Sequence, residues 1–304
     1  TKLYEGILYA MAVVIGYFRY RKSNKRPDWF HVFVLTRAAV LPYLLSFFKN
    51  DFYVSEAWSR YLPESNNFSG FFRKWLARKI VSRAKGVSVV SNSLKNAMIS
   101  HGLNSINFQV INSVVPANFF MTKGLSRNST IVKFLHVSCF DNSVKNISGI
   151  LNAFKLVQAR DFKFNLELVG TGSDFSAMVD YAKDIQVNNV AFSGELTGGN
   201  LVNAYHSNDV LVVFSNFETQ GCVILEAHAC GMPVIATAVG GIPELIAEEN
   251  GVLVSPQDVK GLANAIIDII NGKYNFNSEK IRKQACLKYS RQAIVQQFFD
   301  FYEK

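Results

Sequence analysis

The sequence lacks the features that are typical of membrane-spanning proteins, of secreted proteins and of proteins stabilised by a bound metal ion. Its longest charge-free stretch near the start, residues 6–18, has 13 residues, whereas a bilayer span needs about 20. We therefore expect a buried or surface-lying helix there. The chain begins at Thr1 and no small-residue cleavage site follows this stretch, so we expect no secretory signal. The few cysteines form no CxxC pair and no Cys/His cluster, which favours reduced thiols in a cytosolic protein: Cys139, Cys222, Cys230 and Cys286.

Charge is scarce and unevenly placed. The 304 residues are 18% charged, 49% hydrophobic and 13% aromatic, which excludes a disordered chain and a coiled coil. This length suits two domains of ordinary size. Residues 1–130 hold 18 Lys and Arg against 5 Asp and Glu, whereas residues 131–304 hold 14 against 18. A basic half and a mildly acidic half favour two domains with different partners.

Two basic clusters lie in the first half. One falls within residues 19–26, and the other, within residues 73–85, recurs at helical spacing around Phe72 and Trp75. Such a surface suits peripheral association with an anionic membrane or nucleic acid, and a solvated helix face is an equal alternative. The sequence has no helix-turn-helix, zinc-finger spacing or RNP-like motif, so we expect no nucleic-acid partner.

Short apolar runs alternate with segments of helical period. The expected strands of the second half are residues 131–137, 164–169, 190–192, 210–214, 233–237 and 251–254, with helices at 147–159, 175–184, 201–207 and 259–271. In the first half the expected strands are residues 29–35, 52–55, 87–91 and 108–111, with helices at 37–49, 71–85 and 93–100. The runs are mostly continuous, as in strands buried on both faces. The rhythm predicts βαβ units and an α/β fold with two parallel, doubly wound sheets.

The polar, small-residue segment 121–130 lies where the charge balance changes, and we expect it to link the two domains. Two Rossmann-like sheets in series normally meet at a cleft, and ligands bind beyond the carboxyl ends of their strands. We therefore expect the chemistry in the loops that follow the strands.

The loop after the expected strand 210–214 carries the strongest signal. Glu218 lies at the carboxyl end of this strand, and Glu226 lies inside the helix that follows. We expect Thr219 to cap that helix and to leave the amides of Gly221, Cys222 and Val223 available for a phosphate. The alternative from geometry alone is a helix-start charge and a surface glutamate.

Two glycine motifs follow other strands. Gly240-Gly241 precedes Pro243 and Glu244, and paired glycines let backbone approach a ligand closely. By itself this motif is a tight turn. Gly170-Thr171-Gly172 is a lone GxG without the remainder of a dinucleotide fingerprint.

Together these pieces carry a family resemblance. Residues 218–244 read ETQGCVILEAHACGMPVIATAVGGIPE, with two glutamates separated by seven residues. This stretch resembles the signature of family four, the retaining group of GT-B glycosyltransferases. Residues 131–286 resemble the nucleotide-sugar-binding domain of that family, and the resemblance extends back to residues 27–31 and 110–116. Residues 289–304 look like the family's final segment, which crosses back onto the first domain.

The resemblance implies roles for individual residues. Glu226 would hold the ribose of the donor, and Glu218 would contact hydroxyls of the transferred sugar. Lys145 fits the family lysine that contacts the donor phosphates, so Glu218 and Lys145 are the catalytic candidates. The other donor-binding candidates are Thr219, Gln220, Gly221, Cys222, Val223, Cys139, Gly170 and Gly194. No Asp-x-Asp motif occurs, and the family needs neither a catalytic metal nor a cofactor besides its nucleotide-sugar substrate, of UDP or GDP type.

The sequence departs from the family in three places. The family's glycine-rich first strand-turn and its neighbouring strands have no counterpart, so we expect an incomplete first domain. Cys139 stands where the family carries an arginine on the donor phosphate. Losing such a contact costs about 1.5–3 kcal/mol. Ala57 stands where the family carries a histidine that faces the donor sugar, although the adjacent Glu56, Trp58 and Arg60 are intact.

On the acceptor side we expect His31, Ala57 and Trp58. A core position is the more favoured interpretation of His31, and still more so of His136. We expect an acceptor-side domain over residues 1–128, a nucleotide-sugar-binding domain over 129–286 and a returning helix over 287–304. The two domains are expected to face a cleft.

The function that the resemblance implies is a retaining, hexosyltransferase-type reaction. A sugar moves from a nucleotide diphosphate to a hydroxyl of a glycan or lipid-linked acceptor, in cell-surface polysaccharide or glycolipid synthesis. We expect a cytoplasmic protein, with a peripheral position on the cytoplasmic membrane face as a variant. Two alternatives stay open: a catalytically impaired nucleotide-sugar-binding or partner subunit, and a GT-B nucleotide-sugar epimerase.

Overall fold

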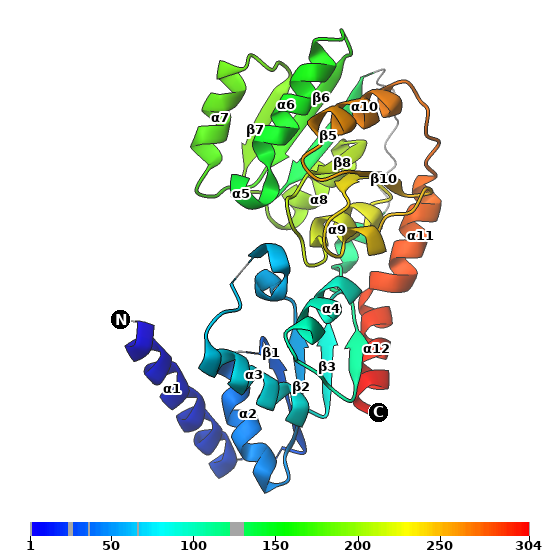
Figure 1. The fold of residues 1–304 in the computed structure, drawn as a ribbon. Coiled ribbons are helices and arrows are strands. Elements are labelled where there is room, and N and C mark those ends of the chain that lie inside the picture. Colours follow the sequence, from blue (N-terminus) through cyan, green and yellow to red (C-terminus); the bar gives the residue numbers. More distant parts are fainter. Residues whose placement is uncertain (1, 24–26, 36, 66, 122–130, 304) are drawn as a thin grey trace. The chain divides into compact units, whose positions relative to one another are not determined.

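The computed structural model describes residues 2–23, 27–35, 37–65, 67–121 and 131–303, called the described residues below. The chain forms two compact units, Thr1–Asn112 with Gln296–Lys304, and Ser113–Val295. Each unit is an α/β structure with one parallel sheet, as the sequence predicts (Figure 1).

The first unit contains a four-stranded sheet whose strands follow one another in chain order. The strands are β1 (Trp29–Phe33), β2 (Asp51–Glu56), β3 (Gly86–Val89) and β4 (Phe108–Val110). The helices are α1 (Lys2–Ser23), α2 (Val40–Leu45), α3 (Phe71–Arg83) and α4 (Asn92–Ser100). Single 3₁₀ turns are η1 (Arg37–Ala39), η2 (Ser46–Phe48), η3 (Ser59–Tyr61) and η4 (Pro63–Ser65).

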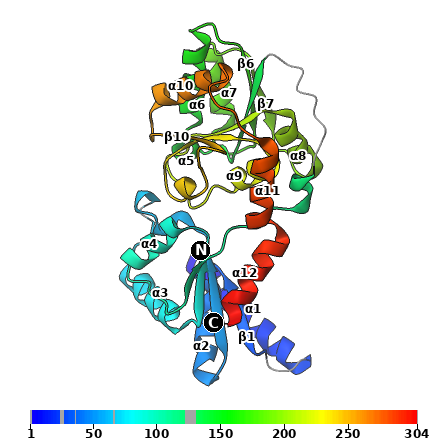
Figure 2. The same cartoon turned by 90° about the vertical axis from the view of Figure 1, so that its right-hand side faces the viewer.

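Successive side chains of β2 point to opposite faces of this sheet. Val54 joins a core that includes Ile80 of α3 and Leu94 of α4. Tyr53 points the other way and packs against Phe301, near the end of α12 (Arg291–Glu303). Figure 2 shows α3 and α4 on one side of these strands and the end of α12 on the other. A strand buried on both faces explains the continuous apolar run in the sequence.

The segment 37–49, predicted as one helix, is divided into η1, α2 and η2. Pro42 lies in the first turn of α2, where its missing amide costs little. In an unbroken helix from residue 37, Pro42 would lie in the interior, and its ring would clash with the carbonyl of Ala38. The segment ends at Lys49, which has φ 63°.

The second unit contains a six-stranded parallel sheet in the order β10-β9-β8-β5-β6-β7. Its strands are β5 (Val132–Val137), β6 (Phe164–Val169), β7 (Val190–Gly194), β8 (Val210–Val213), β9 (Val234–Thr237) and β10 (Gly251–Val254). Its helices and turns are α5 (Asn142–Lys145), α6 (Ile147–Gln158), α7 (Phe175–Asp184), α8 (Gly198–Ser207), α9 (Cys222–Ala229), α10 (Val259–Ile270), α11 (Ser278–Tyr289), η5 (Ala117–Phe120) and η6 (Ile242–Glu244).

Helices cover both faces of this sheet, so it is doubly wound. On one face α6, α7 and α10 contribute to a core that includes Phe154, Met178 and Ile266. On the other face α8, α9 and α11 surround Tyr205 and Leu225. Because helices pack on both faces of the sheet, its strands are buried on two sides, which explains the continuous apolar runs that predict them.

The units divide at residues 112/113 and 295/296, whereas the sequence predicts boundaries at 128/129 and 286/287. Residues 113–120 pack within the second unit. The Val115 amide donates to the Tyr289 carbonyl at 2.9 Å, and the Phe119 ring meets Tyr205. Of the predicted linker 121–130, residues 122–130 lie outside the described residues.

Candidate functional site

The order of the second sheet reverses at β5, which pairs with both β6 and β8. From β5 the chain proceeds through β6 to β7, returns to β8 and continues to β9 and β10. Loops that leave the carboxyl ends of β5 and β8 therefore diverge, and ligands of open α/β sheets bind in the crevice at such a reversal. Lys145 follows β5, and Glu218 follows β8.

Two hydrogen bonds tie the loop after β8 to the short helix α5. The backbone amide of Asn216 donates to the Val144 carbonyl, and its side-chain amide donates to the Ser143 carbonyl, both at 2.8 Å. This connection brings the two loops together. The sequence gives no sign of this role of Asn216, because the role depends on a helix of only four residues with no apolar period.

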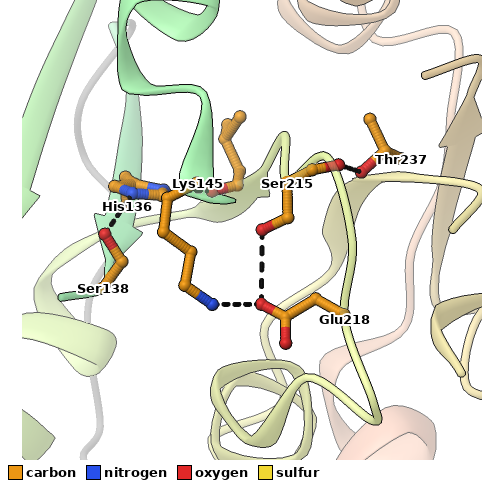
Figure 3. A network of polar contacts seen from close by, with 7 residues as sticks. His136, Ser138, Lys145, Ser215, Glu218 and Thr237 are labelled. Carbon is orange, nitrogen blue, oxygen red and sulfur yellow. Dashed lines mark hydrogen bonds and ion pairs between the residues drawn. The ribbon is translucent and has the colours of Figure 1, made fainter. Parts of the chain in front are cut away.

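Lys145 and Glu218 form an ion pair within this connection, and Figure 3 shows the lysine pointing at the carboxylate. Their side chains are 17% and 13% exposed. Charges at such burial are costly unless they are paired. The structure therefore joins the two residues for which the sequence predicts catalytic roles.

Glu218 is fixed from two further directions. The Ser215 hydroxyl donates to Glu218 Oε1 at 3.3 Å, and Thr237 Oγ1 at the end of β9 donates to the Ser215 carbonyl at 2.7 Å (Figure 3). Gly240 has φ +53°, and a Cβ there would lie 1.7 Å from the Glu218 carbonyl oxygen. The first glycine of the Gly240-Gly241 pair therefore lets its loop lie directly against the Glu218 backbone.

Helix α9 begins with Gly221 as its N-cap, at φ 85°, without a side-chain cap. The expected cap by Thr219 is wrong, because the left-handed Gly221 starts the helix two residues later. Among the described residues, the amides of Gly221, Cys222 and Val223 donate to no acceptor. A helix start with unpaired amides is a favourable place for an anion.

Glu226 lies on α9 and accepts a hydrogen bond of 2.7 Å from the Tyr205 hydroxyl of α8. Burial raises the pKa of the Glu226 carboxyl, and the bond from Tyr205 offsets part of this effect. Burial also raises the pKa of Tyr205 well above its usual value, so this phenol donates. Nothing in the sequence indicates Tyr205, because the contact depends on the packing of α8 beside α9.

Gln220 is buried and fixes a neighbouring segment of backbone. Its side-chain oxygen accepts from the Ser113 amide at 3.2 Å. The side chain of Cys222, two residues further along, is exposed, and its Sγ lies 3.6 Å from Ser113 Oγ.

Gly170 supports the loop that carries Cys139. A Cβ on Gly170, which has φ +127°, would lie 1.8 Å from the Ser138 carbonyl. Its amide donates to the carbonyl of Gly194 at 2.7 Å. The thiol of Cys139 is exposed. The GxG glycine thus permits close packing of two loops beside the reversal of the sheet.

His136 on β5 joins the strands at the same place. Its Nδ1 donates to the Val212 carbonyl at 2.9 Å, and its Nε2 accepts from the Ser138 hydroxyl at 2.8 Å. Burial lowers the pKa of His136 to about 4, so the ring is neutral at pH 7. This is a packing role, in line with the favoured interpretation.

In the first unit, His31 and the pair Ala57–Trp58 have different surroundings. His31 on β1 contacts the hydroxyls of Tyr302 and Ser55 through its two ring nitrogens, and burial lowers its pKa to about 4. Ala57 and Trp58 follow β2, where both amides donate to Glu56 Oε1 at 2.9 Å and both side chains are exposed. His31 therefore contacts the C-terminal helix, whereas Ala57 is accessible.

Within the described ranges, no group of three or more His, Cys, Asp or Glu side chains is close enough to hold a metal ion. No helix within those ranges is long and apolar enough to cross a bilayer.

Residues 132–272, which contain this site, match the family model for Glycosyl transferases group 1. This part of the chain is similar to the group 1 glycosyltransferases. N-acetyl-alpha-D-glucosaminyl L-malate synthase from Bacillus anthracis is 32% identical over 184 residues, which cover 59% of this chain and 46% of that protein. The chain spans about half the length of the curated relatives it matches.

Solved structures of GT-B glycosyltransferases share the two-sheet fold. HepE from Anabaena has a TM-score of 0.77 at 20% identity, over 90% of this chain and 78% of that one. Sucrose-phosphate synthase from Thermosynechococcus elongatus has a TM-score of 0.76 at 22% identity, over 94% and 75%. The fold predicted from the sequence, two α/β units with parallel sheets of the GT-B type, is confirmed.

Proposed function

We propose that the chain is part of a retaining, metal-independent glycosyltransferase of family four, with a nucleotide diphosphate sugar as donor. One observation carries this proposal. At the carboxyl edge of the second sheet, the Lys145–Glu218 ion pair, the unpaired amides at the start of α9 and the Glu226 carboxylate belong to one connected set of loops. A cation and backbone amides suit a diphosphate, and carboxylates suit hydroxyls.

The roles follow from the chemistry of each group. Lys145 and the α9 amides stabilise the charge that develops on the diphosphate as the bond from the sugar's anomeric carbon to phosphate oxygen breaks. Glu218 orients the sugar, and Glu226 holds the ribose. The acceptor hydroxyl attacks the same face, and its proton passes to the leaving phosphate oxygen. The protein contributes by positioning and by electrostatic stabilisation.

The names of relatives and neighbours support a sugar-nucleotide donor. Matched proteins include a sulfoquinovosyl transferase from Arabidopsis thaliana and D-inositol 3-phosphate glycosyltransferases. HepE is described in complexes with UDP and with UDP-glucose. A role in glycolipid synthesis agrees with a matched phosphatidylinositol monomannoside mannosyltransferase from Corynebacterium glutamicum.

Two exposed positions favour a second candidate, a nucleotide-sugar-binding subunit with impaired catalysis. The exposed Cys139 offers no cation to the donor, and Ala57 offers no hydrogen bond to a sugar. Assays of transfer and of donor hydrolysis with the intact gene product separate the candidates. Turnover above the uncatalysed rate identifies an enzyme, and donor binding without turnover identifies a binding subunit.

Calorimetry with UDP, GDP and ADP, each with excess chelator, tests the donor site. We expect one nucleotide to bind without metal. Glu226→Ala should weaken it by about 1–3 kcal/mol, because buried hydroxyl partners are left unpaired. Glu249→Ala is the control, since Glu249 is exposed in the same unit. Binding that requires Mg²⁺ or Mn²⁺, or equal affinity in Glu226→Ala and wild type, would contradict the site.

A further inference from the structure

A pocket of about 550 Å³ lies in the first unit, beyond the carboxyl ends of β1 and β2. Leu35, which follows β1, and Trp58, which follows β2, form part of its wall. Helix α3 supplies Phe72, Leu76 and Ile80. The wall is thus largely apolar, and it offers few partners for the hydroxyls of an unmodified sugar.

Two guanidinium groups interrupt this apolar wall. Arg60 and Arg73 both line the pocket. The Arg60 guanidinium carbon lies 3.8 Å from the centre of the Trp58 ring, which orients the cation. Arg60 Nε is buried without a hydrogen-bond acceptor among the described residues. A buried donor that lacks an acceptor is costly, and an incoming anion removes that cost.

Glu56, the acidic side chain that acts electrostatically on Arg60, is held by other donors. The carboxylate of Glu56 is buried and accepts from the amides of Leu35, Ala57 and Trp58 and from the Tyr61 hydroxyl. Within the described ranges, neither Arg60 nor Arg73 forms an ion pair with a carboxylate. The pocket therefore combines an apolar wall with two cations that form no ion pair, although the negative charge of Glu56 acts on Arg60 from nearby.

We propose that this pocket binds a lipid phosphate, with the phosphate on Arg60 and Arg73 and the adjoining methylenes against Phe72, Leu76 and Ile80. Guanidinium groups match phosphate oxygens in geometry and charge, and an apolar wall gains from each methylene that leaves water. The lipid phosphate would be part of the acceptor molecule whose hydroxyl receives the sugar. That assignment rests on the proposed transferase function, whereas the binding itself does not.

Calorimetry of the full chain without nucleotide tests the chemistry of the ligand. The probes are octyl phosphate and hexyl phosphate below their micelle concentrations, octanol and inorganic phosphate. Octyl phosphate should bind tightest. Each added methylene should improve affinity about fourfold, so octyl should exceed hexyl by about fifteenfold. Inorganic phosphate as tight as octyl phosphate, or octanol as tight, would overturn the proposal.

Three glutamine variants that remove the same charge test the location. Arg60→Gln and Arg73→Gln should each weaken octyl phosphate about tenfold or more. Lys79→Gln, an exposed position on α3 outside the pocket, should leave affinity within twofold. An equal loss of octyl phosphate affinity in Lys79→Gln would show that any positive charge on this surface attracts the ligand, which would contradict the pocket. Wild-type affinity in both Arg60→Gln and Arg73→Gln would exclude the pocket.

A fourth variant tests the apolar wall. The side chain of Phe72 is 69% exposed, so Phe72→Ser should fold. It should reduce the difference between the octyl and hexyl esters, and an unchanged difference would place the alkyl chain elsewhere. UDP affinity, measured on every variant, separates the two proposals. Retained octyl phosphate binding without any UDP binding would reject the donor site alone, and the reverse would reject the pocket alone.

Discussion

Replacing each member of the Lys145–Glu218 ion pair should change nucleotide binding in opposite directions. In the structure each charge neutralises the other. A bound diphosphate competes with Glu218 for the Lys145 ammonium. Lys145→Gln removes the cation that the phosphate needs, whereas Glu218→Gln removes its competitor. UDP should therefore bind Lys145→Gln more weakly than wild type, and Glu218→Gln equally or more tightly.

The magnitude follows from the burial of the pair. A hydrogen bond to a charged group contributes about 1.5–3 kcal/mol, which is about 10- to 150-fold in affinity for Lys145→Gln. The extra affinity of a UDP-sugar over UDP should fall in Glu218→Gln by about tenfold, because this carboxylate is proposed to hold the sugar. Each single variant leaves one charge unpaired at 17% or 13% exposure. Both should therefore melt below wild type, and the double variant should recover part of the loss.

Calorimetry with UDP and a UDP-sugar, together with thermal melting, measures these effects. Lys163→Gln, at an exposed position of the same unit, is the matched control and should bind UDP as wild type does. Wild-type UDP affinity in a folded Lys145→Gln would refute the reasoning. So would a Glu218→Gln variant that loses UDP and the UDP-sugar to the same extent.

Four further predictions concern other parts of the chain. Tyr205→Phe removes the 2.7 Å bond to Glu226 and should weaken both uridine and UDP about 3- to 10-fold in calorimetry; unchanged uridine binding would contradict the ribose role. Gly240→Ala should lose more UDP-sugar affinity than Gly198→Ala, because both have φ near +55° but only at Gly240 would the added Cβ lie 1.7 Å from a carbonyl oxygen; equal losses would show that the strain of a positive φ alone accounts for the effect. Ala57→His should raise the transfer rate at least tenfold. An unchanged rate would show that Ala57 does not limit glycosyl transfer. Cosedimentation with anionic vesicles should fall steeply with salt, since α1 exposes apolar side chains beside basic residues near its end; equal binding to neutral vesicles would contradict an electrostatic surface.

The strands of the second unit could be predicted to within about two residues, because each is a short apolar run between polar or glycine residues. β6 and β10 have the predicted bounds, and β5 begins one residue later than predicted. A parallel strand buried on two faces leaves this signal in its own residues. Helix α11, at residues 278–289, was not predicted, because most of its residues are polar or charged and only a few of them are buried.

The candidate site was predictable where it depends on local sequence and not where it depends on packing. Glu218 and Glu226 stand out because residues 218–244 resemble a family signature that has two glutamates at the same spacing. The start of α9 differs from the prediction because Gly221 adopts φ 85°, a conformation that glycine permits but does not require. Tyr205 reaches Glu226 from another helix, and such a contact has no signature in either segment.

Hydrogen–deuterium exchange of the intact chain, with and without UDP, tests the donor site most directly. Unpaired amides at the start of α9 should exchange quickly in the unliganded protein and slowly once they donate to phosphate oxygens. We predict protection of peptides that cover residues 215–230 and 143–147, and no change in α10, at residues 259–270. Saturating UDP that leaves residues 215–230 unprotected would contradict the account.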